Sequence, residues 1–183
     1  LGNINTMVSL GVVNQEGVLL NTKYDNYSIR ANIGGKINDF ISMGLNVNGA
    51  YSRQNYTNSE GYYAVTGAAL LCDPREPVYN DDGSFNNYIG GHDGIYGFFN
   101  PVQYLMEINR NLEIKDLLST AFLEFAFLKN FKFKSTVNAK INNRSSKEYV
   151  PSTISGTNAP APRDATQTDQ ATDVYNYAAD ELL

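Results

Sequence analysis

The sequence has 183 residues, which is long enough for one domain with a sizeable core. Only 18% of the residues are charged, against roughly 25% in average proteins, and the formal net charge of −5 argues against a general affinity for nucleic acid. The single cysteine, Cys72, excludes an internal disulfide framework and a cysteine-rich zinc site, and the sequence lacks the run of apolar residues that a transmembrane helix needs.

Alternation of apolar and polar residues predicts six long strands. In the third of them, the apolar series that runs from Ile41 to Tyr51 alternates with small or polar residues, so one face is apolar and the other polar. Extended at ~3.3 Å per residue and tilted by about 45°, residues 40–51 would span roughly 25 Å, the height of the apolar band of a membrane barrel. The six strands are predicted at 5–14, 23–37, about 40–53, 113–128, 131–142 and from about 172.

The predicted connections alternate in length. Tight turns are expected at Asn38-Asp39 and Lys129-Asn130, whereas the other connections are the longer segments 15–22, about 54–112 and about 148–172. Short periplasmic turns and long extracellular loops are typical of outer-membrane barrels. The fold class predicted is all-β, an antiparallel up-and-down transmembrane β-barrel fragment with about six long strands. Because both ends of the sequence lie within strand patterns, we expect a piece of a longer protein.

Aromatic residues gather near both ends of the predicted strands. Phenylalanines lie close to the two tight turns, and tyrosines lie near the opposite strand ends. Membrane proteins place aromatic rings at both interfaces of the bilayer, so this distribution favours a membrane-spanning sheet. The residues concerned are Phe40, Phe125, Phe127, Phe131, Phe133, Tyr24, Tyr27 and Tyr51.

Two short helices and one irregular segment are expected within the long connections. Asn100 followed by Pro101 has the pattern of an N-cap and a first helical position, so "PVQYLMEIN" is predicted to be helical. The stretch "GYYAVTGAALL" is a second candidate helix. Residues 151–173 are rich in Pro, Thr and Ala without periodicity, and we expect a mobile or poorly ordered loop there.

An ordered series of motifs runs from Glu16 to Asn138. The element "NQEGVLLNTKYDNYSIRANI" is followed by the strand "INDFISMGLNVNGAYS", and then come "DPREPVYNDDGSF", "FFNPVQYL" and "FLEFAFLKNFKFKSTVNAKIN". In this order and spacing, the segment resembles the SusC/RagA-type TonB-dependent transporters of bacterial outer membranes. Asn26 departs from the arginine that the family often has before its tyrosine-serine pair.

The resemblance implies a barrel of about 22 strands with a plug in its lumen. Residues 1–183 would be part of that single barrel domain, with the plug and the remaining strands outside this sequence. It also implies a location in the outer membrane of a Gram-negative, Bacteroidetes-like bacterium, in contact with its lipids. The implied function is import of glycans or peptides, driven by TonB through the plug, with a SusD-like lipoprotein at the extracellular face. Enzymatic activity, a cofactor and a metal ion are not expected.

Polar residues on the inward strand faces are the candidate site. They would line the lumen and contact substrate or plug, although solvated residues that pair with neighbouring strands would give the same pattern. The predicted lumen-lining residues are Arg30, Asn32, Lys36, Asn46, Asn48, Lys132, Lys134, Asn138 and Lys140.

Other candidate sites lie in the long loop. His92, the only histidine, lacks the partner residues that a catalytic or metal role requires. "NDDGS" lacks the spaced ligands of an EF-hand calcium loop, and Cys72 is interpreted as a small buried hydrophobe. Acidic residues of this loop could supply a carboxylate pair for glycoside hydrolysis, but solvated turn residues are the simpler interpretation. They are Asp73, Glu76, Asp81, Asp82 and Asp93.

Two other functions remain open from the residues alone. The first is a soluble all-β carbohydrate-binding or adhesin module, which would bury the apolar strand faces in a protein core. The second is an outer-membrane hydrolase, which would require a catalytic pair that is not evident in the sequence.

Overall fold

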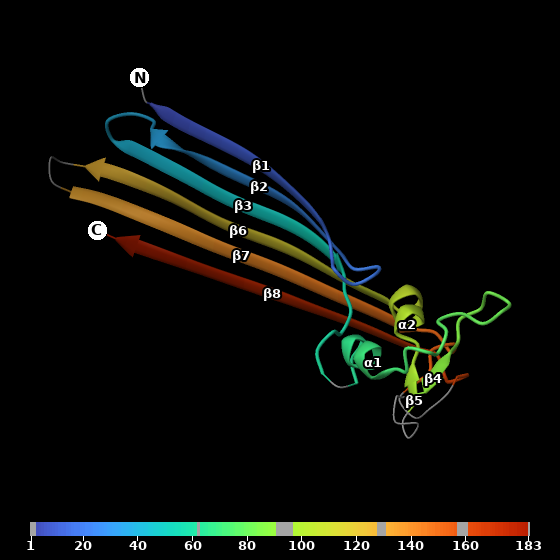
Figure 1. The fold of residues 1–183 in the computed structure, drawn as a ribbon. Coiled ribbons are helices and arrows are strands. Elements are labelled where there is room, and N and C mark those ends of the chain that lie inside the picture. The colour runs from blue at the N-terminus through green and yellow to red at the C-terminus, as the bar shows by residue number, and fades with distance from the viewer. Residues whose placement is uncertain (1–2, 62, 91–96, 128–130, 157–160, 183) are drawn as a thin grey trace.

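The structure is a computed structural model of residues 1–183, and it describes all of them except 1–2, 62, 91–96, 128–130, 157–160 and 183. Six long strands form one antiparallel sheet in the order β1-β2-β3-β6-β7-β8 (Figure 1). Between β3 and β6, the chain forms two short helices and a two-stranded sheet. The elements are β1 Ile4–Glu16, β2 Lys23–Lys36, β3 Ile41–Asn55, α1 Val65–Leu71, β4 Tyr88–Gly90, β5 Gly97–Phe99, α2 Pro101–Glu107, β6 Asn109–Phe127, β7 Phe131–Val150 and β8 Thr166–Leu182.

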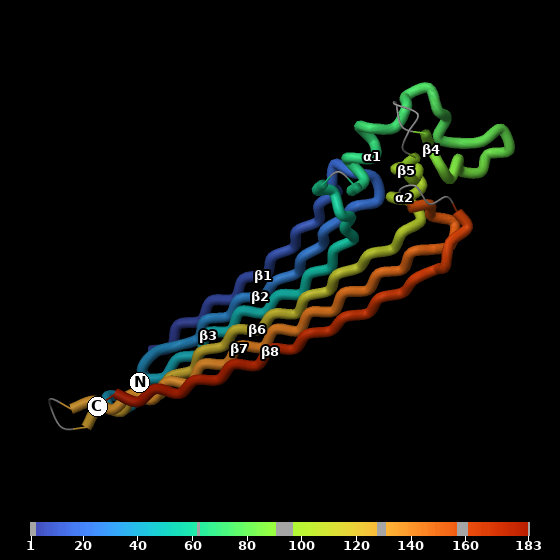
Figure 2. Tube along the Cα trace, turned by 90° about the horizontal axis from the view of Figure 1, so that it is seen from below, coloured from blue at the N-terminus to red at the C-terminus, as the bar shows by residue number. Residues whose placement is uncertain are grey.

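The two ends of the sheet differ in the length of their connections (Figures 1 and 2). At one end, residues 37–40 join β2 to β3, and the side chain of Asn38 closes this turn by accepting hydrogen bonds from the backbone N–H groups of Phe40 (2.9 Å) and Ile41 (2.8 Å). At the other end lie the β1–β2 loop, the insertion between β3 and β6, and the β7–β8 loop. The predicted alternation of loop lengths is therefore present, although the turn at Lys129-Asn130 lies outside the described residues.

The strands at the long-loop end extend further than the sequence predicts. β6 begins at Asn109, β7 continues to Val150, and β8 begins at Thr166. The prediction of an irregular loop over 151–173 is therefore wrong for its second half, which pairs with β7. These strand ends carry polar residues on both faces, so no apolar period marks them, whereas the backbone ladder continues regardless of side-chain polarity.

The buried core lies in the insertion and not in the sheet. Val65 and Ala68 of α1 pack with Phe98 and Phe99 of β5, and Leu19 of the β1–β2 loop packs against this cluster. The sheet is a single layer, so neither of its faces is covered by a second layer of the described chain. The strand residues are accordingly half-buried or exposed, with few exceptions.

Both predicted helices are present. α2 begins at Pro101, directly after the predicted N-cap Asn100, whose side chain accepts hydrogen bonds from the N–H groups of Val102 and Gln103. α1 begins at Val65 and therefore covers the second part of the predicted stretch. Neither helix among the described residues has the length and apolar character needed to cross a membrane.

Candidate functional site: the polar face of the sheet

The strand register divides the large sheet into two faces. Directly paired residues on neighbouring antiparallel strands project to the same side. Leu45 pairs with Ile33 and Ala121, whereas its neighbour Asn46 pairs with Asn32. We call the side that carries Leu45 the apolar face and the side that carries Asn46 the polar face. The alternation of the third strand thus continues into both neighbouring strands, although the polar face also carries apolar residues such as Met7 and Leu118.

The apolar face exposes large hydrophobic side chains over six strands. Along β3, this face carries no charged residue from Ile41 to Tyr51, and the first charged residue is Arg53. Contiguous exposed apolar surface of this extent is unusual for a soluble monomer and marks an interaction surface. Ten residue steps along a strand tilted by about 45° span about 23 Å, close to the apolar band of a membrane barrel. Exposed members include Leu10, Ile29, Leu45, Leu117, Leu123, Val137 and Tyr175.

Aromatic rings mark both ends of the apolar face. Near the tight turns, the rings of Phe127 and Phe131 stack with centroids 6.1 Å apart. Near the long loops, Tyr27 and Tyr51 stack with centroids 6.5 Å apart. Tyr24, which the sequence grouped with these tyrosines, lies instead on the polar face. It is three residue steps from Tyr27, and an odd number of steps along a strand places two side chains on opposite faces.

All nine predicted lumen-lining residues lie on the polar face. Two adjacent rows across the sheet contain most of them, and the two rows are related by a step of two residues along each strand. The remaining three lie closer to the tight-turn end. That this face lines a lumen stays a prediction. The first row is Arg30, Asn48, Leu118 and Lys140, the second is Asn32, Asn46, Thr120 and Asn138, and the others are Lys36, Lys132 and Lys134.

Several of these side chains have partners on neighbouring strands. Arg30 Nε donates to Asn48 Oδ1 at 2.8 Å, and Lys132 Nζ lies 3.2 Å from Glu124 Oε1. The ammonium group of Lys140, by contrast, has no hydrogen bond or ion pair with the described residues. The alternative interpretation from the sequence is that these polar residues pair with neighbouring strands. It applies to Arg30 and Lys132 and not to Lys140.

A hollow of about 650 Å³ lies over the row that contains Arg30 and Lys140. Its wall combines these two cations with the Asn48 amide and the Asp116 carboxylate, and Met7 adds apolar surface. The arrangement offers hydrogen-bond donors and positive charge to a polar ligand and contains no nucleophile paired with a base.

The sequence analysis missed Phe122, which lies on the polar face among hydrophilic side chains. A Cβ atom added to Gly44 would overlap the Phe122 ring, so the glycine makes room for the ring across the strand pair. Lys134 Nζ lies 4.5 Å from the centroid of the same ring, a cation–π distance. A glycine in a long strand was the available signal, because it marks a close approach of another group.

A second missed group joins α2 to the sheet. Arg110 donates through Nη2 to the Tyr104 hydroxyl (2.9 Å) and to Glu148 Oε1 (2.8 Å), and its guanidinium lies 5.3 Å from the centroid of the Tyr104 ring. Arg110 Nη1 is buried without a hydrogen-bond partner among the described residues. Because Arg110 and Glu148 are 38 positions apart, only the register of β6 and β7 could reveal the pair.

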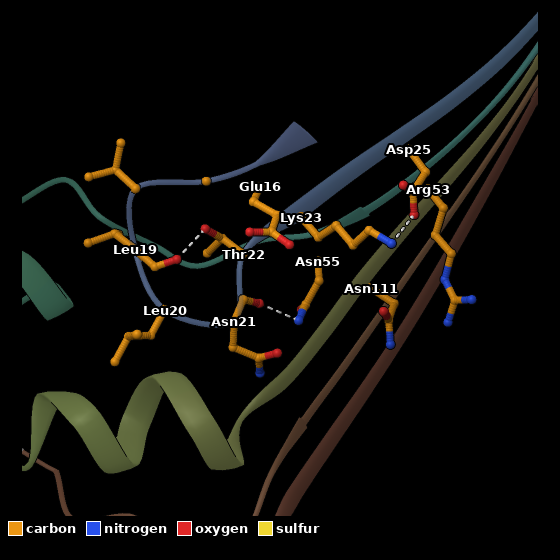
Figure 3. Close-up of a pocket in the computed structure, with 12 residues that line it drawn as sticks. Glu16, Leu19, Leu20, Asn21, Thr22, Lys23, Asp25, Arg53, Asn55 and Asn111 are labelled. Carbon is orange, nitrogen blue, oxygen red and sulfur yellow. Dashed lines mark hydrogen bonds and ion pairs between the residues drawn. The ribbon is translucent and has the colours of Figure 1, made fainter. Parts of the chain in front are cut away.

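A second hollow, of about 590 Å³, lies beside the β1–β2 loop (Figure 3). Lys23 and Asp25 form an ion pair there at 3.1 Å, and Asn55 donates to the backbone oxygen of Asn21 at 2.6 Å. Lys23, Asp25 and Arg53 belong by register to the continuation of the apolar face. This hollow is therefore on the opposite side of the sheet from the predicted lumen residues.

The loop candidates do not form a catalytic group among the described residues. Asp82 accepts hydrogen bonds from Ser84 Oγ (2.6 Å) and Ser84 N (2.9 Å), which lower the pKa of its carboxyl. Asp73 instead pairs with Arg75, and no group of three or more potential metal ligands occurs in the described part of the chain. Cys72 is half-buried, and burial raises the pKa of its thiol. Glu76 and Asp81 are exposed, whereas His92 and Asp93 lie outside the described residues.

No family model matches this sequence. The sequence is 27% identical over 153 residues to TonB-dependent receptor P26 of Formosa agariphila, an alignment that covers 82% of this chain and 14% of the relative. The chain therefore spans about one seventh of the length of that receptor.

The fold is similar to that of two solved structures. One is the RagAB peptide transporter, with a TM-score of 0.70 and 16% identity over 95% of this chain and 20% of that chain. The other is the RagAB peptide importer in a closed-closed state, with a TM-score of 0.63 and 15% identity over 96% of this chain and 20% of that chain. The similar proteins are a receptor and transporters, and not enzymes, which agrees with the sequence-based expectation.

The all-β fold class predicted from the sequence is therefore confirmed. The resemblance to the SusC/RagA-type TonB-dependent outer-membrane transporters is confirmed as well, since the chain is similar in sequence to a TonB-dependent receptor and in fold to a part of the RagAB transporter.

Proposed function

We propose that residues 1–183 form part of the β-barrel domain of an outer-membrane TonB-dependent receptor that imports glycans or peptides. The observation that carries this proposal is the separation of the sheet into an exposed apolar face and a polar face along six long antiparallel strands. A bilayer covers the first face and a water-filled lumen the second. The similarity to a TonB-dependent receptor and to the RagAB transporter supports it.

The edges of the sheet support the same proposal. β1 pairs only with β2, and β8 pairs only with β7, so each edge strand leaves one side without a partner among the described residues. Unpaired backbone groups are not tolerated in the hydrocarbon region, and closed barrels satisfy them all. In our proposal, further strands and the plug lie in other parts of the parent protein, and the loops at 56–108 and 151–165 face the cell exterior.

Two partners belong to this proposal through the family resemblance. A SusD-like lipoprotein would cover the extracellular face, where the insertion with its own packed core stands at the end of the sheet. The TonB complex would act through the plug. The membrane would be the outer membrane of a Gram-negative, Bacteroidetes-like bacterium, as the Formosa relative suggests.

The membrane placement is tested by scanning residues 40–51 with single cysteines in the parent protein, in outer-membrane vesicles. A fluorophore is attached to each cysteine, and a lipid-soluble quencher is added. We expect strong quenching at positions 41, 43, 45 and 47 and weak quenching at 42, 44, 46 and 48. Absence of quenching at every position would place the apolar face in a protein core and would favour a soluble all-β module.

Active import is tested separately, by measuring cargo uptake in cells with and without TonB. We expect uptake to stop when TonB is deleted. Uptake that continues unchanged without TonB would contradict the proposed energy coupling, even if the strands cross the membrane.

A further inference from the structure

The charges of this chain are distributed unequally between its surfaces. The whole sequence has a formal net charge of −5, yet cations outnumber anions on the polar face of the six-stranded sheet. Among the described strand residues of this face, the cations are Arg30, Lys36, Arg110, Lys132, Lys134, Lys140 and Arg144, and the anions are Asp116, Glu124, Glu148 and Asp180. The surface that would face the cargo is therefore positive within an acidic chain.

Three of the four anions of this face have a partner on a neighbouring strand, and the fourth, Asp180, lies opposite Thr136 and does not line the hollow. Glu124 pairs with Lys132 at 3.2 Å, and Glu148 accepts from Arg110. Asp116, which lines the hollow, accepts a hydrogen bond from Asn142. These contacts leave Arg30 and Lys140 without an anionic partner in the described part of the chain, and both line the hollow of about 650 Å³.

The spacing of these two cations suits an extended ligand. Arg30 on β2 and Lys140 on β7 belong to one row across the sheet, and β3 and β6 lie between them. At about 4.8 Å per strand, their backbones are about 14 Å apart. Asn48 lies between them and orients the Arg30 guanidinium through the 2.8 Å hydrogen bond. A chain molecule with repeated negative charges could contact both cations at once.

The adjacent row offers groups for hydroxyls. Asn32 and Asn46 are directly opposite each other, and neither side-chain amide makes a hydrogen bond with the described residues. Thr120 and Asn138 continue this row and are joined by a 2.8 Å hydrogen bond. An amide both donates and accepts hydrogen bonds, as sugar hydroxyls do. A row of amides beside a row of cations therefore matches a polyhydroxylated chain that carries acidic groups.

We propose that the cargo of this receptor is an acidic oligosaccharide, whose carboxylate or sulfate groups contact Arg30 and Lys140 and whose hydroxyls contact Asn32 and Asn46. This inference rests on the proposed function, because it requires the polar face to be the lumen wall. It adds the charge and chemical class of the cargo, which the resemblance to importers of glycans or peptides leaves open.

The test measures binding to the purified parent receptor in detergent by titration calorimetry. The probes are an oligogalacturonate and a sulfated galactan oligosaccharide, a neutral maltooligosaccharide of equal length, and an oligoglutamate peptide. We expect the tightest binding for an acidic oligosaccharide. Binding should weaken about tenfold in Arg30→Gln and in Lys140→Gln, equal to about 1.4 kcal/mol each. It should also weaken with added salt, because charged contacts are screened.

Lys115→Gln is the matched control, since it removes one lysine from the opposite side of the same sheet. This variant should bind the acidic oligosaccharide as the unmodified receptor does. Tighter binding of the neutral oligosaccharide or the peptide, no binding of either acidic oligosaccharide, or no effect of the two lumen variants would each overturn the inference. Equal weakening for acidic and neutral probes would also overturn it and would indicate contacts to the plug.

These outcomes are independent of the test of the proposed function. If the quenching pattern and the TonB dependence are as expected but the cargo is neutral or a peptide, only the present inference fails. If the quenching pattern is absent, the proposed function fails first, and charge-dependent binding would then belong to a soluble protein.

Discussion

Asn100 connects three segments of the insertion, and its replacement should loosen them together. Its side chain is buried and uses all of its hydrogen-bonding capacity. The oxygen accepts from Val102 N (3.0 Å) and Gln103 N (3.2 Å), and the amide nitrogen donates to Val78 O (2.8 Å) and Asn86 O (3.0 Å). One residue thus begins α2 and holds the preceding loop against it.

The cost of Asn100→Ala follows from these four bonds. Loss of an N-cap costs about 1 kcal/mol, and each hydrogen bond that the amide donates contributes about 0.5–1.5 kcal/mol, since both acceptor residues are half-buried and Val78 O keeps its bond from Asn86 N. We expect the insertion to lose about 2–4 kcal/mol of local stability. Asn100→Asp keeps the cap but places a carboxylate against two carbonyl oxygens, so it should lose the loop contacts while α2 keeps its first turn.

Hydrogen exchange of the parent protein, read by mass spectrometry on peptides from 101–108, measures this loss. A change of 3 kcal/mol corresponds to a more than hundredfold faster exchange. Asn80→Ala is the control, because Asn80 bonds only within its own exposed turn, to Ser84 and Phe85. If Asn100→Ala exchanges within about threefold of the unmodified protein, the four bonds do not carry the stability assigned to them.

Three further predictions concern the sheet and the insertion. Leu45→Arg on the apolar face should destabilise the folded receptor by about 2–4 kcal/mol if the residue lies near the bilayer centre, and it should therefore reduce the heat-modifiable, folded fraction on gels. Asn46→Arg on the polar face should have little effect on that fraction. Equal effects of the two changes would contradict the assignment of faces. Gly44→Ala should cost about 1–3 kcal/mol in denaturant unfolding, because its Cβ would overlap the Phe122 ring, and Phe122→Ala should restore most of that loss in the double variant. Additive losses would show that the ring is not the cause. The raised pKa of Cys72 predicts slow alkylation at pH 8 that continues to accelerate with pH beyond the range where a free thiol of ordinary pKa has levelled off. Alkylation as fast as that of a free thiol at pH 8 would mean that the residue is not buried in solution.

Much of the sheet can be predicted from the sequence because a single physical rule governs it. Where one strand face meets lipid, as proposed for Ile41 to Val47, apolar residues must recur at every second position, and the pattern is readable. From Thr166 to Gln170, both faces are polar, so this part of the ladder leaves no trace in the pattern. Asn100 and Pro101 are readable for a local reason, since the cap and the first helical residue are adjacent in sequence.

The candidate site is only partly readable, because it depends on contacts between distant strands. Parity along each strand places Arg30 and Lys140 on the same face, but the row that they share follows only from the register. Arg110 and Glu148 illustrate the limit, since each has the appearance of an ordinary charged strand residue until β6 and β7 are aligned. Gly44 indicates that another group approaches the strand closely, but the sequence pattern does not identify that group as the Phe122 ring.

The insertion between β3 and β6 also has a consequence for the order of folding. β3 and β6 pair along their length although residues 56–108 separate them, whereas residues 37–40 suffice to join β2 to β3. Closing the longer loop as a flexible chain would cost about 2 kcal/mol more conformational entropy than closing the six-residue β1–β2 loop. If the insertion collapses around Phe98 and Phe99 first, the two strand ends are brought together, and the backbone bond from Tyr56 N to Arg110 O (3.2 Å) can start the ladder. We therefore expect the pairing of β3 with β6 to be the slow step of assembly, with a rate set by how fast the insertion itself folds.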